Sequence, residues 1–185
     1  SNATLAIAGD FDPAEARRMI ERYFGWMPKV PRPAPPPAPP PLTAPVKQSL
    51  TIPDKVELAR AYLIWHAPPA ETLAFAETQL LADVLGHGKS SRLYKALVRE
   101  QQIASTVEVG IEPQSYGSLL IAELTGRPGV KPEALVAAAE AELNRLAREP
   151  LPEAELVRAR NQRLTDWAHE IETLLGRSQA LQQGQ

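Results

Sequence analysis

The chain has 185 residues, a formal net charge of −2 and no cysteine, and 44% of its residues are hydrophobic. This length allows one ordinary domain or two small ones with a buried core. The nearly balanced charge gives no electrostatic reason to expect a nucleic-acid partner, and no run of 18 apolar residues predicts a membrane span. Without cysteine there can be no disulfide, thiolate metal site or cysteine nucleophile.

The beginning of the chain suggests a piece of a longer protein. Residues 1–3 are typical of the remnant of a cleaved expression tag. Residues 4–9 form a short apolar run that ends in glycine, which predicts a buried strand. Asp12 and Pro13 then predict the start of a helix with one apolar face turned inward. Because proteins rarely begin inside a core strand, we expect residues 4–27 to be the end of a preceding strand–helix unit.

A proline-rich linker follows at residues 28–47, where ten of the 19 prolines fall between Pro28 and Pro45. Such a run cannot supply a helix or a sheet ladder, and it favours the polyproline II conformation of a stiff spacer. The alternative is a ligand for a proline-binding domain. We favour the linker, because no cluster of basic residues lies beside the prolines.

Residues 48–185 predict an α+β domain with a mainly antiparallel sheet and helices packed on one face. The run at 56–66 begins with alternation and ends in a continuous apolar stretch, which predicts a central strand partly covered on both faces. Two further strands are expected at 103–111 and 118–125, joined as a hairpin. The remaining expected elements are a short strand at 48–52 and helices at 73–85, at 92–100, from 132 to 149 and from 152 onward.

One segment imitates a phosphate-binding loop. Gly88-Lys89-Ser90 matches the tail of such a loop, but Asp83 occupies the place of its first glycine. The segment also follows a predicted helix, whereas a phosphate-binding loop follows a strand. We therefore interpret it as a glycine-rich turn between two helices, with Ser90 or Ser91 at the helix start.

No catalytic residue or metal ligand can be assigned from the residues themselves. The three histidines, His66, His87 and His169, form neither of the spacings that place two imidazoles toward zinc on one helix face. Asp83 and His87 are four residues apart and could meet on one helix, but a helix-end histidine is often stabilised in this way. No serine lies in a nucleophile elbow, and no carboxylate pair suggests acid–base chemistry.

Residues 80–103, LLADVLGHGKSSRLYKALVREQQI, resemble the C-terminal domain of the pitrilysin/insulinase family of zinc peptidases, which includes mitochondrial processing peptidase. The family pattern there is a helix, a small-residue turn, Ser-Ser-Arg-Leu, and then Leu-Arg-Glu before a strand. The matching residues are Gly86, Gly88, Ser90, Ser91, Arg92, Leu93, Leu97, Arg99 and Glu100, with Val98 in the second leucine place. The segments 8–13, 23–25 and 152–163 are also similar, so the resemblance spans nearly the whole chain.

The resemblance implies a processing-peptidase-like half-module whose zinc ligands and catalytic glutamate lie in a preceding domain. We therefore expect no cofactor in this chain, and zinc in the parent protein. Some members hold the substrate with an arginine and a tyrosine seven residues apart. Arg99 matches that arginine and is our candidate substrate-binding residue, whereas Thr106 stands in the tyrosine place. The alternative that we favour for Arg99 is a structural pairing with Glu100 or with a carboxylate of the sheet.

Two main functions follow from the resemblance. The domain could form one wall of the peptide-binding chamber of an active zinc endopeptidase, or it could belong to an inactive member that serves as a scaffold or partner subunit. A third hypothesis is an adaptor that acts through its proline-rich segment. The expected partners are a peptide or unfolded protein, the N-terminal zinc domain of the same or a partner chain, and a second copy of this chain. Bacterial members with such a linker are often exported, which favours the periplasm and leaves the cytoplasm open.

Overall fold

The computed structural model describes residues 3–28, 30–31, 33–34, 36–37 and 47–183. The chain divides into two compact units, one made of Pro39–Arg163 and the other of Ser1–Ala38 with Leu164–Gln185. Part of the predicted linker, including residues 38–46, lies outside the described residues, and its described remainder is in neither helix nor strand.

Helix α1, Pro13–Phe24, begins where the sequence predicts. The backbone N–H of Glu15 donates to the Asp12 carboxylate at 2.9 Å, and proline occupies the first turn. The predicted inward face is wrong for this structure, because no residue of α1 is buried. The strand predicted at residues 4–9 is also absent, and its apolar side chains are exposed. A strand needs a hydrogen-bonding partner, and this segment has none among the described residues.

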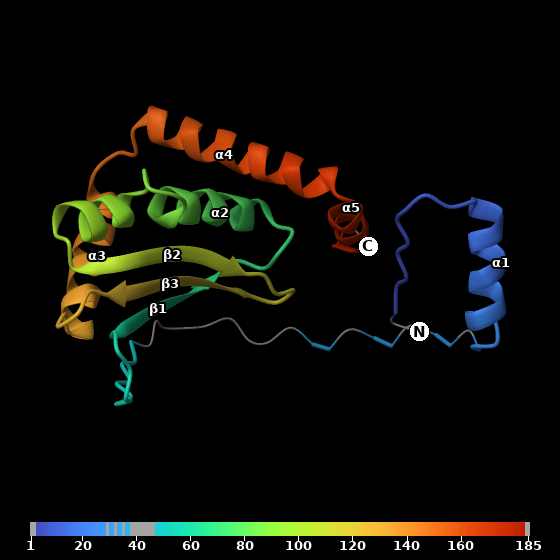
Figure 1. Cartoon of the computed structure of the whole chain (residues 1–185), viewed down its shortest axis with the longest axis horizontal. Coiled ribbons are helices and arrows are strands. Elements are labelled where there is room, and N and C mark those ends of the chain that lie inside the picture. Colours follow the sequence, from blue (N-terminus) through green and yellow to red (C-terminus); the bar gives the residue numbers. More distant parts are fainter. Residues whose placement is uncertain (1–2, 29, 32, 35, 38–46, 184–185) are drawn as a thin grey trace. The chain divides into compact units, whose positions relative to one another are not determined.

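The sheet of the larger unit has the strand order β1–β3–β2, and both pairings are antiparallel (Figure 1). The strands are β1, Arg60–Ala67, β2, Ala104–Glu112, and β3, Ser118–Gly126. The predicted hairpin of β2 and β3 is confirmed, whereas residues 48–52 form no strand. The prediction of a central strand covered on both faces is wrong for β1, which lies at the edge and alternates between exposed and buried residues.

Helices pack against one face of the sheet, which we call the inner face. They are α2, Leu73–Gly86, η1, Tyr94–Glu100, and α3, Pro132–Arg148. Helix α2 lies along β2, and α3 along β1 (Figure 1). The core between these layers is rich in leucine, and its most deeply buried side chains include Leu85, Leu93, Leu97, Leu124 and Leu135. The predicted α+β class with helices on one face is therefore confirmed.

Two further helices follow, α4, Glu153–Glu172, and α5, Leu174–Gln183. No helix in the described part of the chain has the length and apolar character needed to cross a membrane. Helix α4 buries little of its surface, because Leu156, Leu164 and Trp167 are exposed and Ala159 is the buried residue of this helix.

The segment predicted as a short helix at 92–100 is mainly a π-helix. The N–H of Gln101 donates to the carbonyl of Ala96, five residues back, at 3.0 Å. The helix ends at Glu100, Gln102 then reverses the backbone with a φ of 53°, and the N–H of Ile103 donates to the carbonyl of Leu97 at 3.0 Å. This turn delivers the chain directly into β2.

The end of α2 lies unusually close to the sheet. A Cβ atom added to Gly86 would come within 2.7 Å of the backbone nitrogen of Val109 in β2. Real Cβ atoms do not approach backbone atoms so closely, and the neighbour here is a packed strand that cannot move aside cheaply. Glycine is therefore required at this position by the helix–sheet contact.

We predict that Gly86→Ala destabilises the protein by about 1–2 kcal/mol, because the overpacking outweighs the better helix propensity of alanine. Urea unfolding measures the difference. Gly110→Ala is the matched control, since a Cβ at that strand position meets nothing within 4 Å. It should change stability by no more than about 0.5 kcal/mol. Equal effects of the two substitutions would contradict the steric explanation.

Candidate functional site

The segment 80–103 contains buried structural residues and exposed ones. Gly86, Ser91, Arg92, Leu93 and Leu97 are buried. They hold the turn between α2 and η1 and contribute to the leucine-rich core. The Ser91 hydroxyl donates to the carbonyl of Gly88 at 2.7 Å, so this serine closes the turn. The buried part of the motif therefore has a structural role, and chemistry with a ligand is left to its exposed residues.

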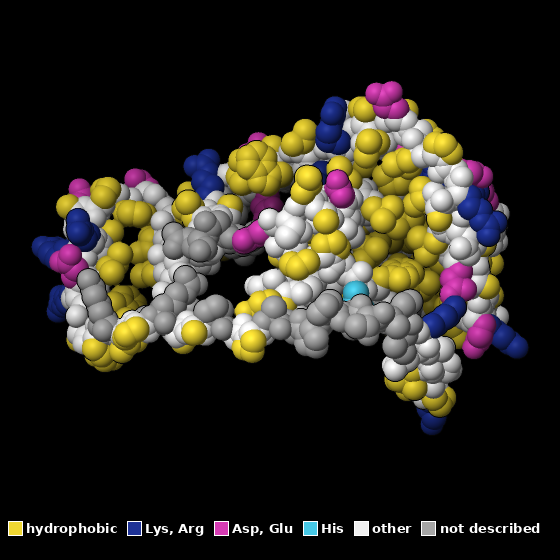
Figure 2. Space-filling model, turned by 180° about the vertical axis from the view of Figure 1, so that it is seen from behind, with side chains coloured by type: hydrophobic (Ala, Val, Ile, Leu, Met, Phe, Trp, Pro, Cys, Tyr) yellow, Lys and Arg dark blue, Asp and Glu magenta, His cyan; other side chains and the backbone are white. Residues whose placement is uncertain are grey.

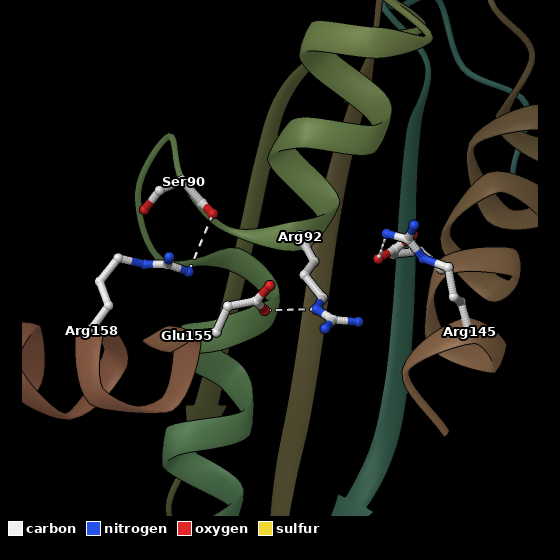
Figure 3. Close-up of polar contacts among 6 residues, drawn as sticks. Ser90, Arg92, Arg145, Glu155 and Arg158 are labelled. Carbon is white, nitrogen blue, oxygen red and sulfur yellow. Dashed lines mark hydrogen bonds and ion pairs between the residues drawn. The ribbon is translucent and has the colours of Figure 1, made fainter. Parts of the chain in front are cut away.

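Arg92 carries a buried charge at the centre of this turn (Figure 3). Its Nε donates to a carboxylate oxygen of Glu155 in α4 at 2.8 Å, and the two side chains are 8% and 20% exposed. Its Nη1 has no hydrogen-bond partner among the described residues. A buried guanidinium is costly unless it is paired, so the contact with Glu155 fixes the start of α4 against the turn.

Arg99, the candidate substrate-binding residue, lies exposed on the last turn of η1. Its guanidinium makes no hydrogen bond or ion pair with any other described residue, so the expected pairing with Glu100 or with a sheet carboxylate is not seen. Its guanidinium is therefore accessible from solvent. The role of Arg99 toward a substrate stays a prediction.

Thr106, which stands in the family's tyrosine place, lies on β2 beside a β-bulge at Ser105. The Ser105 hydroxyl donates to the carbonyl of Thr125 at 3.2 Å. Thr106 is exposed on the face of the sheet opposite to the helices, whereas Arg99 belongs to a helix packed on the inner face. The structure records no contact between the two side chains.

The second face of the sheet, which we call the outer face, has no helix packed on it in the described unit Pro39–Arg163. Tyr62 and Ile64 of β1 are 54% and 56% exposed on it, and Ile121 of β3 lies opposite Ile64. In Figure 2, hydrophobic side chains (yellow) are exposed over much of the larger unit on the side drawn there. Together the strands leave an apolar surface that a soluble sheet would normally cover.

Acidic residues border this apolar surface. A hollow of about 250 Å³ opens above Gly110, with Glu108, Glu112 and Glu123 in its lining. Arg60 pairs with Glu123 at 2.9 Å. Hydrogen bonding with the Tyr62 hydroxyl, and then the charge of Glu123, raise the pKa of Arg60 above its ordinary value. The outer face is thus apolar at Tyr62, Ile64 and Ile121 and acidic at Glu108, Glu112 and Glu123.

A larger cavity, of about 370 Å³, lies between the turn after α2 and the first half of α4. Arg163 binds the Asp83 carboxylate through two contacts, Nε–Oδ2 at 2.6 Å and Nη2–Oδ1 at 2.8 Å. The expected Asp83–His87 meeting is therefore not the main role of this carboxylate. The predicted glycine-rich turn between two helices is present, and Gly88 has a φ of 72°.

The sequence analysis missed the residues of α4 that line or close this region. Glu155, Arg158, Ala159, Gln162 and Arg163 follow the three- and four-residue spacing of one helix face. That spacing is present in the sequence, but polar residues at helical spacing usually indicate a solvated face. Ala159, a small apolar residue at the centre of this face, is the signal that could have identified the face as a packed one.

The histidines do not form a metal centre. His66 is exposed on β1, and His169 approaches Glu172 at 3.4 Å on α4. Within residues 3–28 and 47–183, no group of three or more His, Cys, Asp or Glu side chains could hold a metal ion.

Comparisons with known structures support the fold. A protease from Helicobacter pylori matches with a TM-score of 0.74 and 23% identity, over 91% of this chain and 41% of that protein. A Bordetella parapertussis protein, described as the inactive peptidase domain of an assigned zinc protease, matches with a TM-score of 0.60 and 27% identity, over 67% of each chain. An assigned zinc protease of Bordetella pertussis matches with a TM-score of 0.61 and 28% identity, over 70% of this chain and 71% of that one.

No curated protein sequence matches the chain. The chain spans 41% of the length of the Helicobacter protease and about two thirds of the length of the two Bordetella proteins. The model of the Peptidase M16 inactive domain matches residues 1–163. This is the C-terminal, non-zinc domain of the pitrilysin family that the sequence resembles. On this match, the chain belongs to the peptidase M16 inactive-domain family.

Proposed function

We propose that this domain forms one wall of the peptide-binding chamber of a zinc metallo-endopeptidase whose zinc site lies outside the 185 residues. The peptide or unfolded protein would lie between this wall and the N-terminal zinc domain of the same or a partner chain. Zinc with an open coordination position would supply the activated water, and the residues described here would bind and orient substrate.

The observation that carries the proposal is the uncovered outer face of the sheet. Apolar side chains of β1 and β3 lie exposed there, whereas the inner face is filled by helices. Burying such a surface against a peptide or a facing domain is favourable, at about 25 cal/mol per Å² of apolar area. The apolar run of β1 suggested that both faces of this strand are buried. A peptide or a facing domain that binds the outer face would bury the second face.

Arg99 is a second candidate for contact with the substrate, separate from the outer face, because it lies on a helix packed against the inner face of the sheet. It lies in a π-helical segment, a conformation that is rare in proteins overall but occurs often at functional sites. An exposed guanidinium can donate two parallel hydrogen bonds to a peptide carboxylate, or can donate to the single oxygen of a peptide carbonyl group. Thr106 is too short to replace a tyrosine phenol, so Arg99 would act without that partner.

The second candidate function is a scaffold or partner subunit in a catalytically inactive family member. The description of the matching family as an inactive domain fits both functions, because each places the chemistry elsewhere. The zinc content of the parent protein distinguishes them. By analogy with exported bacterial members, we propose a periplasmic location for the parent.

We predict that the parent protein holds about one zinc ion per polypeptide after dialysis against metal-free buffer, and hydrolyses unfolded peptides in a chelator-sensitive manner. The 185-residue chain alone should hold no stoichiometric zinc and cleave nothing. Metal analysis and a peptide-hydrolysis assay measure both properties. A parent without zinc would favour the scaffold function, and hydrolysis by the 185-residue chain would refute the assignment of catalysis to another domain.

We predict that Ile64→Lys in the parent raises the KM for peptide hydrolysis roughly tenfold, because a charge replaces apolar contact area on the proposed wall. Val56→Lys is the matched control, since Val56 is similarly exposed but precedes the sheet. It should leave the KM unchanged. If both variants retain the original KM while zinc and activity are present, the outer face is not part of the chamber.

We predict that Arg99→Gln lowers kcat/KM of the parent about tenfold, the effect of removing one charge-assisted hydrogen bond. Arg148→Gln removes the same charge from an exposed position in the last turn of another helix, α3, and should have little effect. Circular dichroism checks that both variants fold. Equal activities of the two variants would contradict a substrate contact by Arg99.

A further inference from the structure

The cavity beside the turn after α2 has the size of a small-ligand site and a polar, charged lining. Its volume of about 370 Å³ falls in the range of ligand pockets. Residues from two distant parts of the sequence form its walls, namely the turn His87–Ser90 and the α4 residues Arg158, Ala159 and Gln162. All of them belong to the unit Pro39–Arg163, so this cavity is complete within one compact body.

The charge of the lining is positive. Lys89 comes from the turn and Arg158 from α4, and the one carboxylate in the lining, that of Asp83, is bound by Arg163 through two contacts. Lys89 makes no ion pair or hydrogen bond with any other described residue. Arg158 donates from Nη2 to the carbonyl of Ser90 at 3.4 Å. This acceptor is neutral and the contact is long, so the positive charge of Arg158 is not neutralised.

The backbone of the turn adds donors beside these two cations. In the described part of the chain, the N–H groups of Gly88, Lys89 and Ser90 donate to no backbone carbonyl. Gly88 adopts a φ of 72°, and the space beside its Cα is open. Consecutive free N–H groups in a turn that includes a left-handed residue form a concavity that attracts anions. Figure 3 shows Arg158 extending from α4 toward the turn that carries Ser90.

We propose that this cavity binds a small oxyanion, a phosphate or carboxylate group, between Arg158, Lys89 and the backbone of the Gly88–Ser90 turn. The site is not the nucleotide-binding loop that Gly88-Lys89-Ser90 imitates, because the turn follows a helix and lacks that loop's first glycine. Its second cation comes from a residue about 70 positions later in the chain. The inference is independent of the proposed chamber wall.

The test titrates the 185-residue chain with sodium phosphate at pH 7 and constant ionic strength, and follows backbone amides by two-dimensional NMR. We expect saturable shifts that are largest at the Gly88–Ser90 turn and the first half of α4. Arg158→Gln and Lys89→Gln should each weaken phosphate binding about tenfold, as expected for the loss of a charge-assisted hydrogen bond.

Arg160→Gln and Lys131→Gln are the matched controls, because they remove the same charges from exposed positions that do not line the cavity. They should change the dissociation constant less than twofold. The proposal is overturned if neither phosphate nor acetate produces a saturable shift, or if all four variants weaken binding alike, which is the behaviour of general charge attraction. Should one cavity variant not fold, the other still decides the comparison.

A parallel titration with sodium acetate distinguishes the two sources of the oxyanion. Saturable shifts with acetate at the same amides, lost in Arg158→Gln, would identify a carboxylate site suited to an acidic side chain or a chain terminus. Shifts with phosphate alone would identify a phosphoryl site, because three oxygens can meet both cations and the turn together. An absence of shifts with either anion refutes the proposal.

Discussion

The structure depends on the burial of only one face of a three-stranded sheet. Helices α2, η1 and α3 fill the inner face with leucine side chains, and no helix covers the outer face in the described unit. This asymmetry fixes the register of every strand, because a shift by one residue would exchange the buried and exposed sets. It also leaves apolar side chains such as Ile64 in solvent, which is unfavourable unless another surface covers them.

The turn between α2 and η1 connects this core to the rest of the unit. Gly86 allows α2 to approach β2, and Arg92 pairs with Glu155 to hold the beginning of α4. The sequence signature of the family is thus largely a packing device. Its buried residues set the course of the backbone, and its exposed members, Lys89 nearby and Arg99 at the end of η1, are left free to meet ligands.

The outer face of the sheet and the cavity at the turn suggest two separate binding roles. The outer face is broad, apolar and bordered by glutamates, as expected for contact with a peptide or a neighbouring domain. The cavity at the turn is small, cationic and formed by two elements, as expected for an anionic group. Neither feature includes a group of metal ligands among the described residues.

The sequence by itself determined the α+β class, the β2–β3 hairpin, most helix boundaries and the family, because these depend on local periodicity, turn residues and a short motif. It did not determine that β1 lies at an edge, since the apolar run of β1 is the same whether its second face is covered inside the domain or outside it. Only the tertiary structure brought Arg158 to the turn of Ser90 and Glu155 to Arg92. Such pairs are separated by more than 60 residues, and no local pattern encodes which charged side chains will meet.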